Sequence, residues 1–383
     1  MSALTPYVRQ LAALEARGRK RVLAAREGID FSSNDYLGLA HDPAIAGAIA
    51  QAIARGVPVG SGGSRLLRGN APEHAALEAK AAAFFGAEAA LYLANGFAAN
   101  VALLSVLPRP GDLIVADALV HASMHDGIRQ SRAHAVFVAH NDAQSFDDAI
   151  TAWRRDGGTG RPWIVVETLY SMDGDIAPVD DLAAVARRHD AMLMVDEAHA
   201  TGVYGKDGKG VSAHLEGAEN LVTLHTCGKG LGVEGALICA ARPLVDILVN
   251  KARPFIFSTA PSPLMAVAVS AALDRIAGEG GDALRMALRR RIEAARVHIC
   301  DPLGLPAPAS QILPVMIGDD RMAVNIAESC RAAGFDVRAV RPPTVPAGTA
   351  RMRISLTLNS VEEDIAGLAT ALVPLVRARE AAA

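Results

Sequence analysis

Seven short apolar runs recur through the middle of the chain. They are mostly aliphatic or β-branched and are bounded by turn residues, which is typical of buried strands. They occupy residues 89–93, 112–116, 135–139, 163–167, 192–196, 221–224 and 236–240. Amphipathic segments with helical spacing separate them, for example at 145–154 and 179–189. This alternation predicts βαβ units and a mainly parallel, seven-stranded α/β sheet flanked by helices.

The two ends of the chain show other patterns. A helical pattern at 281–299 leads to strand patterns near 312–317 and 352–358, with a helix at 323–334 between them. A smaller α+β unit is therefore expected at the C-terminus. The start of the chain reads as a helix followed by an extended segment. The expected organisation is an N-terminal segment at 1–45, a large domain at 46–285 and a small domain at 286–383.

Composition narrows the functional classes. The formal net charge is −3 over 383 residues, and no charged run is long enough to form a tail, so nucleic-acid binding is not expected. The N-terminus is charged and amphipathic without an apolar core, and no apolar run is long enough to cross a membrane. Four cysteines without a CxxC pair favour reduced thiols in a cytoplasmic protein and no metal site.

Two charged residues follow predicted strands. Asp196 ends the run MLMVD, at the edge where open α/β sheets bind ligands, and it either caps the next helix or provides a functional charge. Lys229 lies among glycines in TCGKGLG, just after another strand. A lone lysine is usually a solvated surface residue, but flanking glycines permit the close backbone approach that a bulky cofactor requires. The spacing of a Walker phosphate loop is absent.

A third motif, NGFAAN at 95–100, follows the first of these strands and opens a helix. Such a helix N-terminus presents free N–H groups to an anion, although an ordinary strand-to-helix turn has the same pattern. A phosphate seat, a strand-end carboxylate and a later lysine are together the groups that pyridoxal phosphate needs. Lys229 would form the Schiff base with this cofactor, and Asp196 would keep its pyridine nitrogen protonated.

Three more polar residues come just after other strands. His121 suits stacking on the ring of the cofactor, with a solvated loop histidine as the alternative. Ser171 and His199 are placed to form hydrogen bonds with its phenolic oxygen. The candidate catalytic residues are therefore Lys229, His121, Asp196 and His199.

Longer strings extend this pattern along nearly the whole chain. In order they are FSSNDYLGLA, GSGGSRLLRGNAPEH, LANGFAAN, ALVHASMHDGIR, YSMDGDIAPV, VDEAHATGVYG, TCGKGLGVEGA, FIFSTAPSP and RPPTVPAGTARMRISL. The set resembles the α-oxoamine synthases, a family of fold-type I pyridoxal-phosphate enzymes. Members of this family join an amino acid to an acyl-CoA and release carbon dioxide and CoA. The resemblance implies that Lys229 also acts as the base that removes the α-proton of the amino acid.

The resemblance assigns further residues to the cofactor. Gly96, Phe97 and Thr226 would contact the region of its phosphate group. Thr259, beside Ser258, would reach the phosphate in the other subunit, which implies a homodimer with shared active sites.

Other residues are assigned to the substrates by the same resemblance. Arg353 would bind the carboxylate of the amino acid, with Asn34 and His121 close to the substrate. Thr344 would lie at the acyl substrate. Arg21 would also lie there, although it belongs to a basic cluster at 17–21 for which a solvated helix face is the alternative.

Three strings, VDEAHATGV, GKGLGVEGA and RPPTVPAGTAR, favour L-alanine with pimeloyl-CoA or pimeloyl-ACP as the substrates, a step of biotin biosynthesis. The alternatives within the family are a glycine C-acetyltransferase and a 5-aminolevulinate synthase. An aminotransferase would share Lys229 and Asp196 but would need no thioester. Two departures from the family pattern lie near the substrates: TLNS at 357–360, where relatives often have TAAH, and a short link between Arg21 and FSSN.

Overall fold

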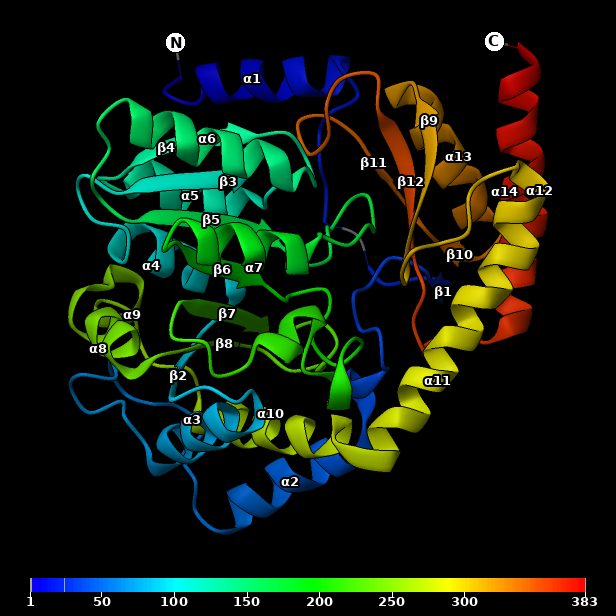
Figure 1. The fold of residues 1–383 in the computed structure, drawn as a ribbon. Helices are drawn as coiled ribbons and strands as arrows, with labels where there is room; N and C mark the ends of the chain where they lie inside the picture. Colours follow the sequence, from blue (N-terminus) through cyan, green and yellow to red (C-terminus); the bar gives the residue numbers. More distant parts are fainter. Residues whose placement is uncertain (1, 24, 383) are drawn as a thin grey trace.

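The computed structural model describes residues 2–23 and 25–382, and its largest element is a seven-stranded sheet (Figure 1). The strands are β2 (Ala89–Leu93), β3 (Leu113–Asp117), β4 (His134–Val138), β5 (Pro162–Glu167), β6 (Met192–Asp196), β7 (Leu221–Thr226) and β8 (Ala236–Ala240). Their order is β2-β8-β7-β6-β5-β3-β4, and only β8 runs antiparallel to its neighbours. The predicted mainly parallel sheet and its seven strands are confirmed.

Helices cover both faces of this sheet, because each strand directs alternate side chains to opposite sides. One face packs against α4 (Gly96–Val106), α5 (Ala122–Gln130), α8 (Arg242–Lys251) and α9 (Arg253–Ile256). The other face packs against α6 (Ala143–Arg155), α7 (Val179–Arg188), α3 (Pro72–Phe84) and α10 (Pro263–Ile276), with α2 (Pro43–Ala54) outside them. Short 3₁₀ turns are η1 (Leu39–His41), η2 (Lys206–Gly208) and η3 (Val211–Leu215).

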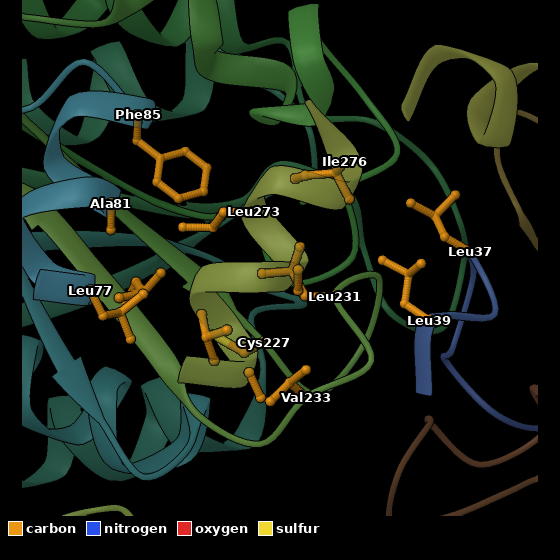
Figure 2. Packing of buried hydrophobic residues seen from close by; sticks show 14 of the residues in the cluster. Leu37, Leu39, Leu77, Ala81, Phe85, Cys227, Leu231, Val233, Leu273 and Ile276 are labelled. Atoms are coloured by element: carbon orange, nitrogen blue, oxygen red, sulfur yellow. The ribbon is translucent and has the colours of Figure 1, made fainter. Parts of the chain in front are cut away.

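A buried apolar cluster anchors the loop that carries Lys229 (Figure 2). Leu231 and Cys227, on either side of the lysine, are fully buried in it. Burial of one leucine side chain stabilises a fold by roughly 1.5–3 kcal/mol. Gly232 has a φ of 66°, and a Cβ there would overlap the backbone at Leu39. Close packing and a left-handed glycine therefore fix the position of this loop.

The C-terminal part is a separate layered unit. A three-stranded antiparallel sheet has the order β11-β12-β9, and helices pack against it (Figure 1). The elements are β9 (Ile312–Gly318), β11 (Arg338–Val340), β12 (Ala350–Ser355), α11 (Gly278–Ala295), η4 (Arg296–Cys300), α12 (Asp301–Leu303), α13 (Asp320–Ala332) and α14 (Glu362–Ala382). Residue 285 lies inside α11, and the division of the chain into domains stays a prediction.

The N-terminal segment joins this C-terminal unit. After α1 (Thr5–Ala16), whose residues are not buried, the short strand β1 (Ile29–Asp30) pairs in parallel with β10 (Phe335–Asp336). Residues that are far apart in the sequence therefore lie side by side next to the large sheet. No helix in the described ranges is both long and apolar enough to cross a membrane.

Candidate active site

Asp196 lies at the carboxyl end of β6, as predicted, and is 4% exposed. Its Oδ2 accepts a hydrogen bond of 2.8 Å from Nδ2 of Asn100 on α4, and its Oδ1 accepts one of 2.9 Å from the backbone N–H of Ala198. Two donors to one buried carboxylate fix its orientation. Asn100 was not predicted as a site residue, although it ends the quoted string LANGFAAN.

A second buried carboxyl lies beside Asp196. Glu167 ends β5 and is in register with Asp196 on the same face of the sheet. Burial, together with the negative charge of Asp196, raises the pKa of Glu167 to about 8, while Lys229 opposes the shift. Its Oε1 is buried without a hydrogen-bond partner among the described residues. Glu167 ends the predicted strand at 163–167 but was not predicted as a site residue.

Lys229 extends from the turn between β7 and β8 toward this edge. Its Nζ lies 2.8 Å from Nε2 of His199. Burial lowers the pKa of Lys229, and the charges of Asp196 and Glu167 counteract part of that effect. A lowered pKa raises the fraction of neutral amine, the form that acts as a nucleophile or base.

His199 connects the lysine to a chain of hydrogen bonds. Burial and the nearby charges of Lys229 and Arg353 lower the pKa of His199 well below its usual value, so the ring is neutral. Its Nδ1 lies 2.6 Å from the hydroxyl of Tyr36, and that hydroxyl donates to Oδ1 of Asn34 over 3.0 Å. Tyr36, within the string FSSNDYLGLA, is a further residue that was not predicted.

The chain of bonds ends at Arg353 on β12. Its Nη2 donates to the same Oδ1 of Asn34 at 3.0 Å, and its Nε donates to the carbonyl of Ser171 at 2.6 Å. Nη1 donates to Oγ of Ser355 at 2.7 Å. These bonds hold a guanidinium that is only 7% exposed in one orientation. The structure therefore joins Asn34, His199 and Arg353, which are remote in sequence.

Gly96 and Thr226 meet at the N-terminus of α4. A Cβ added at Gly96 would overlap Oγ1 of Thr226, so only glycine permits this approach. Asn95 caps the helix by accepting from the backbone N–H of Ala98 at 2.9 Å. The side chain of Phe97 in the first turn is exposed. The first turn of an eleven-residue helix beside a hydroxyl provides donors suited to a phosphate group.

A cavity of about 670 Å³ lies next to this site, and Ser171, whose carbonyl accepts from Arg353, is part of its lining. Its lining brings together four predicted residues, Arg21, His121, Ser171 and Thr344. His121 is exposed at the N-cap of α5, and its Nδ1 lies 2.7 Å from Oγ of Ser123. The cavity therefore extends from the predicted ring-stacking histidine to the two predicted acyl-contacting residues.

Thr259 has a different environment. It is exposed on the stretch between α9 and α10 and is not among the described residues that line the cavity. The single chain does not bring Thr259 to the other predicted site residues.

These groups match the chemical needs of pyridoxal phosphate. The amine of Lys229, the buried carboxylate of Asp196 and the narrow approach of Gly96 to Thr226 correspond to its aldehyde, pyridine nitrogen and phosphate. Fold and site together define a pyridoxal-phosphate-dependent enzyme of fold type I.

Comparison with known proteins agrees with this class. The model of the family "Aminotransferase class I and II" matches residues 26–372. An 8-amino-7-oxononanoate synthase from Chromobacterium violaceum is 44% identical over 91% of this chain and 90% of its own length. One from Geobacter sulfurreducens is 40% identical over 91% and 89%. The chain belongs to the 8-amino-7-oxononanoate synthase family within the class I and II aminotransferases.

Solved structures show the same fold. Serine palmitoyltransferase from S. paucimobilis, in a variant with a bound pyridoxal phosphate–myriocin aldimine, matches with a TM-score of 0.88 and 25% identity over the full length of both chains. The 8-amino-7-oxononanoate synthase of Francisella tularensis matches with a TM-score of 0.77 and 26% identity, over 92% of this chain and 99% of that one. These matches agree with the predicted fold class and cofactor.

Proposed function

We propose that this protein catalyses the decarboxylating condensation of L-alanine with a pimeloyl thioester. The products are 8-amino-7-oxononanoate, carbon dioxide and the free thiol carrier, CoA or acyl carrier protein, in biotin biosynthesis. The observation that carries the proposal is the hydrogen-bonded chain from Nζ of Lys229 to the guanidinium of Arg353, beside a cavity large enough for an acyl chain. The curated relatives, 40–44% identical over about nine-tenths of the chain or more, support the same reaction.

The cofactor would be held by Lys229 at its aldehyde carbon, by Asp196 at its pyridine nitrogen and by the first turn of α4 with Thr226 at its phosphate. His121 would stack on its ring, and Ser171 and His199 would approach its phenolic oxygen. When bound, pyridoxal phosphate supplies an electron sink for the negative charge that develops on the α-carbon of alanine. Asp196 keeps that sink effective because its charge favours a protonated pyridine nitrogen.

The amine of Lys229 takes the α-proton of alanine. Oδ1 of Asn34 accepts from both Arg353 and Tyr36, so the tyrosine proton points to Asn34, and Nδ1–H of His199 donates to the tyrosine oxygen. Nε2 of the neutral histidine then accepts an N–H from Lys229. This arrangement leaves the lone pair of Nζ free for the substrate.

Arg353 binds the carboxylate of alanine. The three hydrogen bonds that Arg353 donates leave an N–H group on each terminal nitrogen for the substrate, and a planar fork suits a carboxylate. The α-carbon then attacks the thioester carbonyl, the C–S bond breaks, and the carrier leaves as a thiolate that takes a proton from solvent. The alanine carboxylate departs as carbon dioxide, and Lys229 returns the proton to the α-carbon.

We propose that a second copy of the chain completes the site with Thr259. Large apolar side chains are exposed next to it: Phe257 is 71% exposed, Val59 73% and Leu67 84%. The segments that carry them are adjacent, since Oγ of Ser262 donates to the carbonyl of Val59 at 2.5 Å. Exposed apolar groups gathered in one place are typical of a subunit interface.

Four buried free cysteines favour a cytoplasmic location.

The test is thiol release by the purified protein supplied with pyridoxal phosphate. L-alanine with pimeloyl-CoA is compared with glycine plus acetyl-CoA and with glycine plus succinyl-CoA, and pimeloyl-ACP is run beside pimeloyl-CoA to identify the carrier. We expect release with alanine and a pimeloyl thioester only. Preference for a glycine pair would refute the substrate assignment. If alanine alone converted the cofactor to its amine form as fast as the enzyme turns over, the protein would be an aminotransferase.

A further inference from the structure

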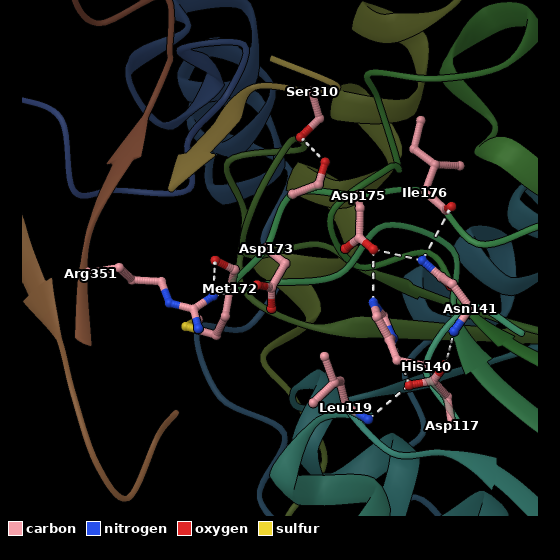
Figure 3. A network of polar contacts seen from close by, with 11 residues as sticks. Asp117, Leu119, His140, Asn141, Met172, Asp173, Asp175, Ile176, Ser310 and Arg351 are labelled. Carbon is pink, nitrogen blue, oxygen red and sulfur yellow. Dashed lines mark hydrogen bonds and ion pairs between the residues drawn. The ribbon is translucent and has the colours of Figure 1, made fainter. Parts of the chain in front are cut away.

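The loop between β5 and α7 carries Ser171 and lines part of the cavity. Figure 3 shows the polar contacts that hold the rest of this loop. The C-terminal sheet holds one side of this loop. The guanidinium of Arg351 on β12 forms an ion pair with Asp173, and Oγ of Ser310 donates to the carbonyl of Gly174 at 2.7 Å. The position of Ser171 therefore depends on contacts that the rest of the loop makes.

The other side of the loop is bonded to His140, which follows β4. Its Nε2 lies 2.7 Å from Oδ2 of Asp175, and its Nδ1 lies 2.9 Å from Oδ1 of Asp117 at the end of β3. Asn141 supports the same bridge, since its Nδ2 donates to Asp175 at 2.7 Å and its backbone N–H donates to Asp117 at 2.8 Å. One imidazole thus connects two strand-end loops.

This geometry requires a charged ring. Carboxylates only accept hydrogen bonds, so a neutral imidazole would direct a lone pair at one of them. Burial lowers the pKa of His140, but the bonds and charges of Asp117 and Asp175 outweigh it and raise the pKa overall. The titratable groups that face the ring are these two carboxylates and Tyr170, whose ring lies edge-on at a centroid distance of 4.4 Å.

Asp117 extends the bridge to a second segment of the cavity lining. The same Oδ1 that meets His140 accepts the backbone N–H of Leu119 at 2.8 Å. Leu119 and His121, two residues further on, both line the cavity. The imidazolium therefore joins the loop that carries Ser171 to the loop that carries Leu119 and His121, and both loops line the cavity.

We infer that His140 is a positioning residue: as an imidazolium between Asp117 and Asp175, it fixes the relative position of the two loops against which the acyl thioester binds. The inference rests on the proposed function, because that function defines the occupant of the cavity. His140 itself does not line the cavity. It acts on the substrate only through the two loops.

The test compares His140→Gln with His189→Gln in the enzyme loaded with pyridoxal phosphate. His189 makes a similar bond, 2.8 Å from its Nε2 to Asp147, at a place that does not line the cavity. We expect His140→Gln to raise the KM for pimeloyl-CoA about 10-fold, with little change in kcat or in the KM for alanine. The affinity for pimeloyl-CoA, measured by calorimetry, should fall by the same factor. His189→Gln should leave these quantities unchanged.

A pH series and a double-mutant cycle separate positioning from plain stabilisation. In the wild type the KM for the thioester should rise as the pH passes the pKa of His140, and in His140→Gln this step should be absent. Asp175→Asn should add little to His140→Gln, because both remove the same bridge. If the two histidine variants bound pimeloyl-CoA equally well and His140→Gln only had a lower unfolding temperature, this inference would be wrong and the proposed function would still stand. A wild type that neither binds nor turns over any thioester would overturn the proposed function as well.

Discussion

The two ends of the site are built differently. At the proposed cofactor end, Asp196 and Glu167 end neighbouring strands of the large sheet and are 4% and 2% exposed. At the proposed acyl end, Arg21 and Thr344 are exposed on irregular segments that line the cavity. The cofactor end has hydrogen bonds of 2.6–3.0 Å between side chains from distant parts of the chain.

This contrast separates chemistry from selectivity. Groups fixed by sheet register and burial can hold a reactive cofactor in one geometry, as catalysis requires. Exposed groups on loops can change without disturbing the core, so they suit recognition of different acyl chains. We therefore expect substitutions at the cofactor end to reduce turnover strongly, and substitutions at the acyl rim to change apparent affinity slightly.

The largest effect is expected from Asp196→Asn. Removal of the charge opposite the pyridine nitrogen should lower kcat by about 100-fold or more, because a buried charge interaction is lost. Folding should change far less, because the new side chain keeps an oxygen that can accept from Asn100. Steady-state kinetics and thermal unfolding measure the two effects. Near-wild-type turnover would contradict the role of Asp196 and weaken the comparison.

A smaller effect is expected from Arg353→Lys. An ammonium cannot reproduce the bidentate fork, so the KM for alanine should rise about 10- to 100-fold, while the KM for the thioester stays close to that of the wild type. Substrate titrations of both substrates measure this. An increase confined to the KM for the thioester would place Arg353 at the acyl substrate instead, and its assignment to the carboxylate of alanine would be wrong.

Glu167→Gln tests the buried carboxyl through stability. Because the folded pKa is raised from 4.5 to about 8, the native state holds a proton in this range that the unfolded chain has released. The contribution of Glu167 to the free energy of unfolding is complete below the unfolded pKa and is lost as the pH rises through the folded pKa. The free energy falls by up to about 1.4 kcal/mol per pH unit in this range. Urea unfolding at several pH values should show a shallower decline in the variant. Glu219→Gln, at an exposed position, is the control, and an unchanged slope in Glu167→Gln would argue against a protonated Glu167.

The smallest effect is expected from Arg21→Ala. An exposed guanidinium contributes about 0.2–1 kcal/mol to an ionic contact, so the KM for the thioester should rise by only about two- to five-fold. The effect should shrink at high salt. If kcat fell as much as in Asp196→Asn, the proposed division between the two ends of the site would be wrong.

The large sheet could be predicted from the sequence because its signal is local. The runs at 89–93, 192–196 and 236–240 have the observed bounds of β2, β6 and β8. Strands buried on both faces are apolar throughout, and each ends at a turn. By contrast β11, at Arg338–Val340, was not predicted, because three residues with an exposed arginine do not form a recognisable run. The pairing of β1 with β10 was missed because it joins segments about 300 residues apart.

The site shows the same limit. Asp196 was recognisable because it ends an apolar run, and Lys229 because glycines flank it. Asn100 and Tyr36 were in the quoted strings, but their roles depend on partners 96 and 163 positions away in the chain. Glu167 gains its raised pKa from sheet register, which no local pattern encodes. The roles of the predicted residues stay predictions that the substitutions above can test.

The contact between Asn34 and Arg353 can form only late in the synthesis of the chain. The two residues are 319 positions apart, and β1 pairs with a strand that leaves the ribosome just as late. At about 5–20 residues per second, the first segment waits on the order of 15–60 s for its partner. The large sheet can form during synthesis, but the proposed amino-acid-binding corner is assembled only after translation is nearly complete. Nascent chains released early would therefore contain the strands of the large sheet without the proposed binding site for alanine.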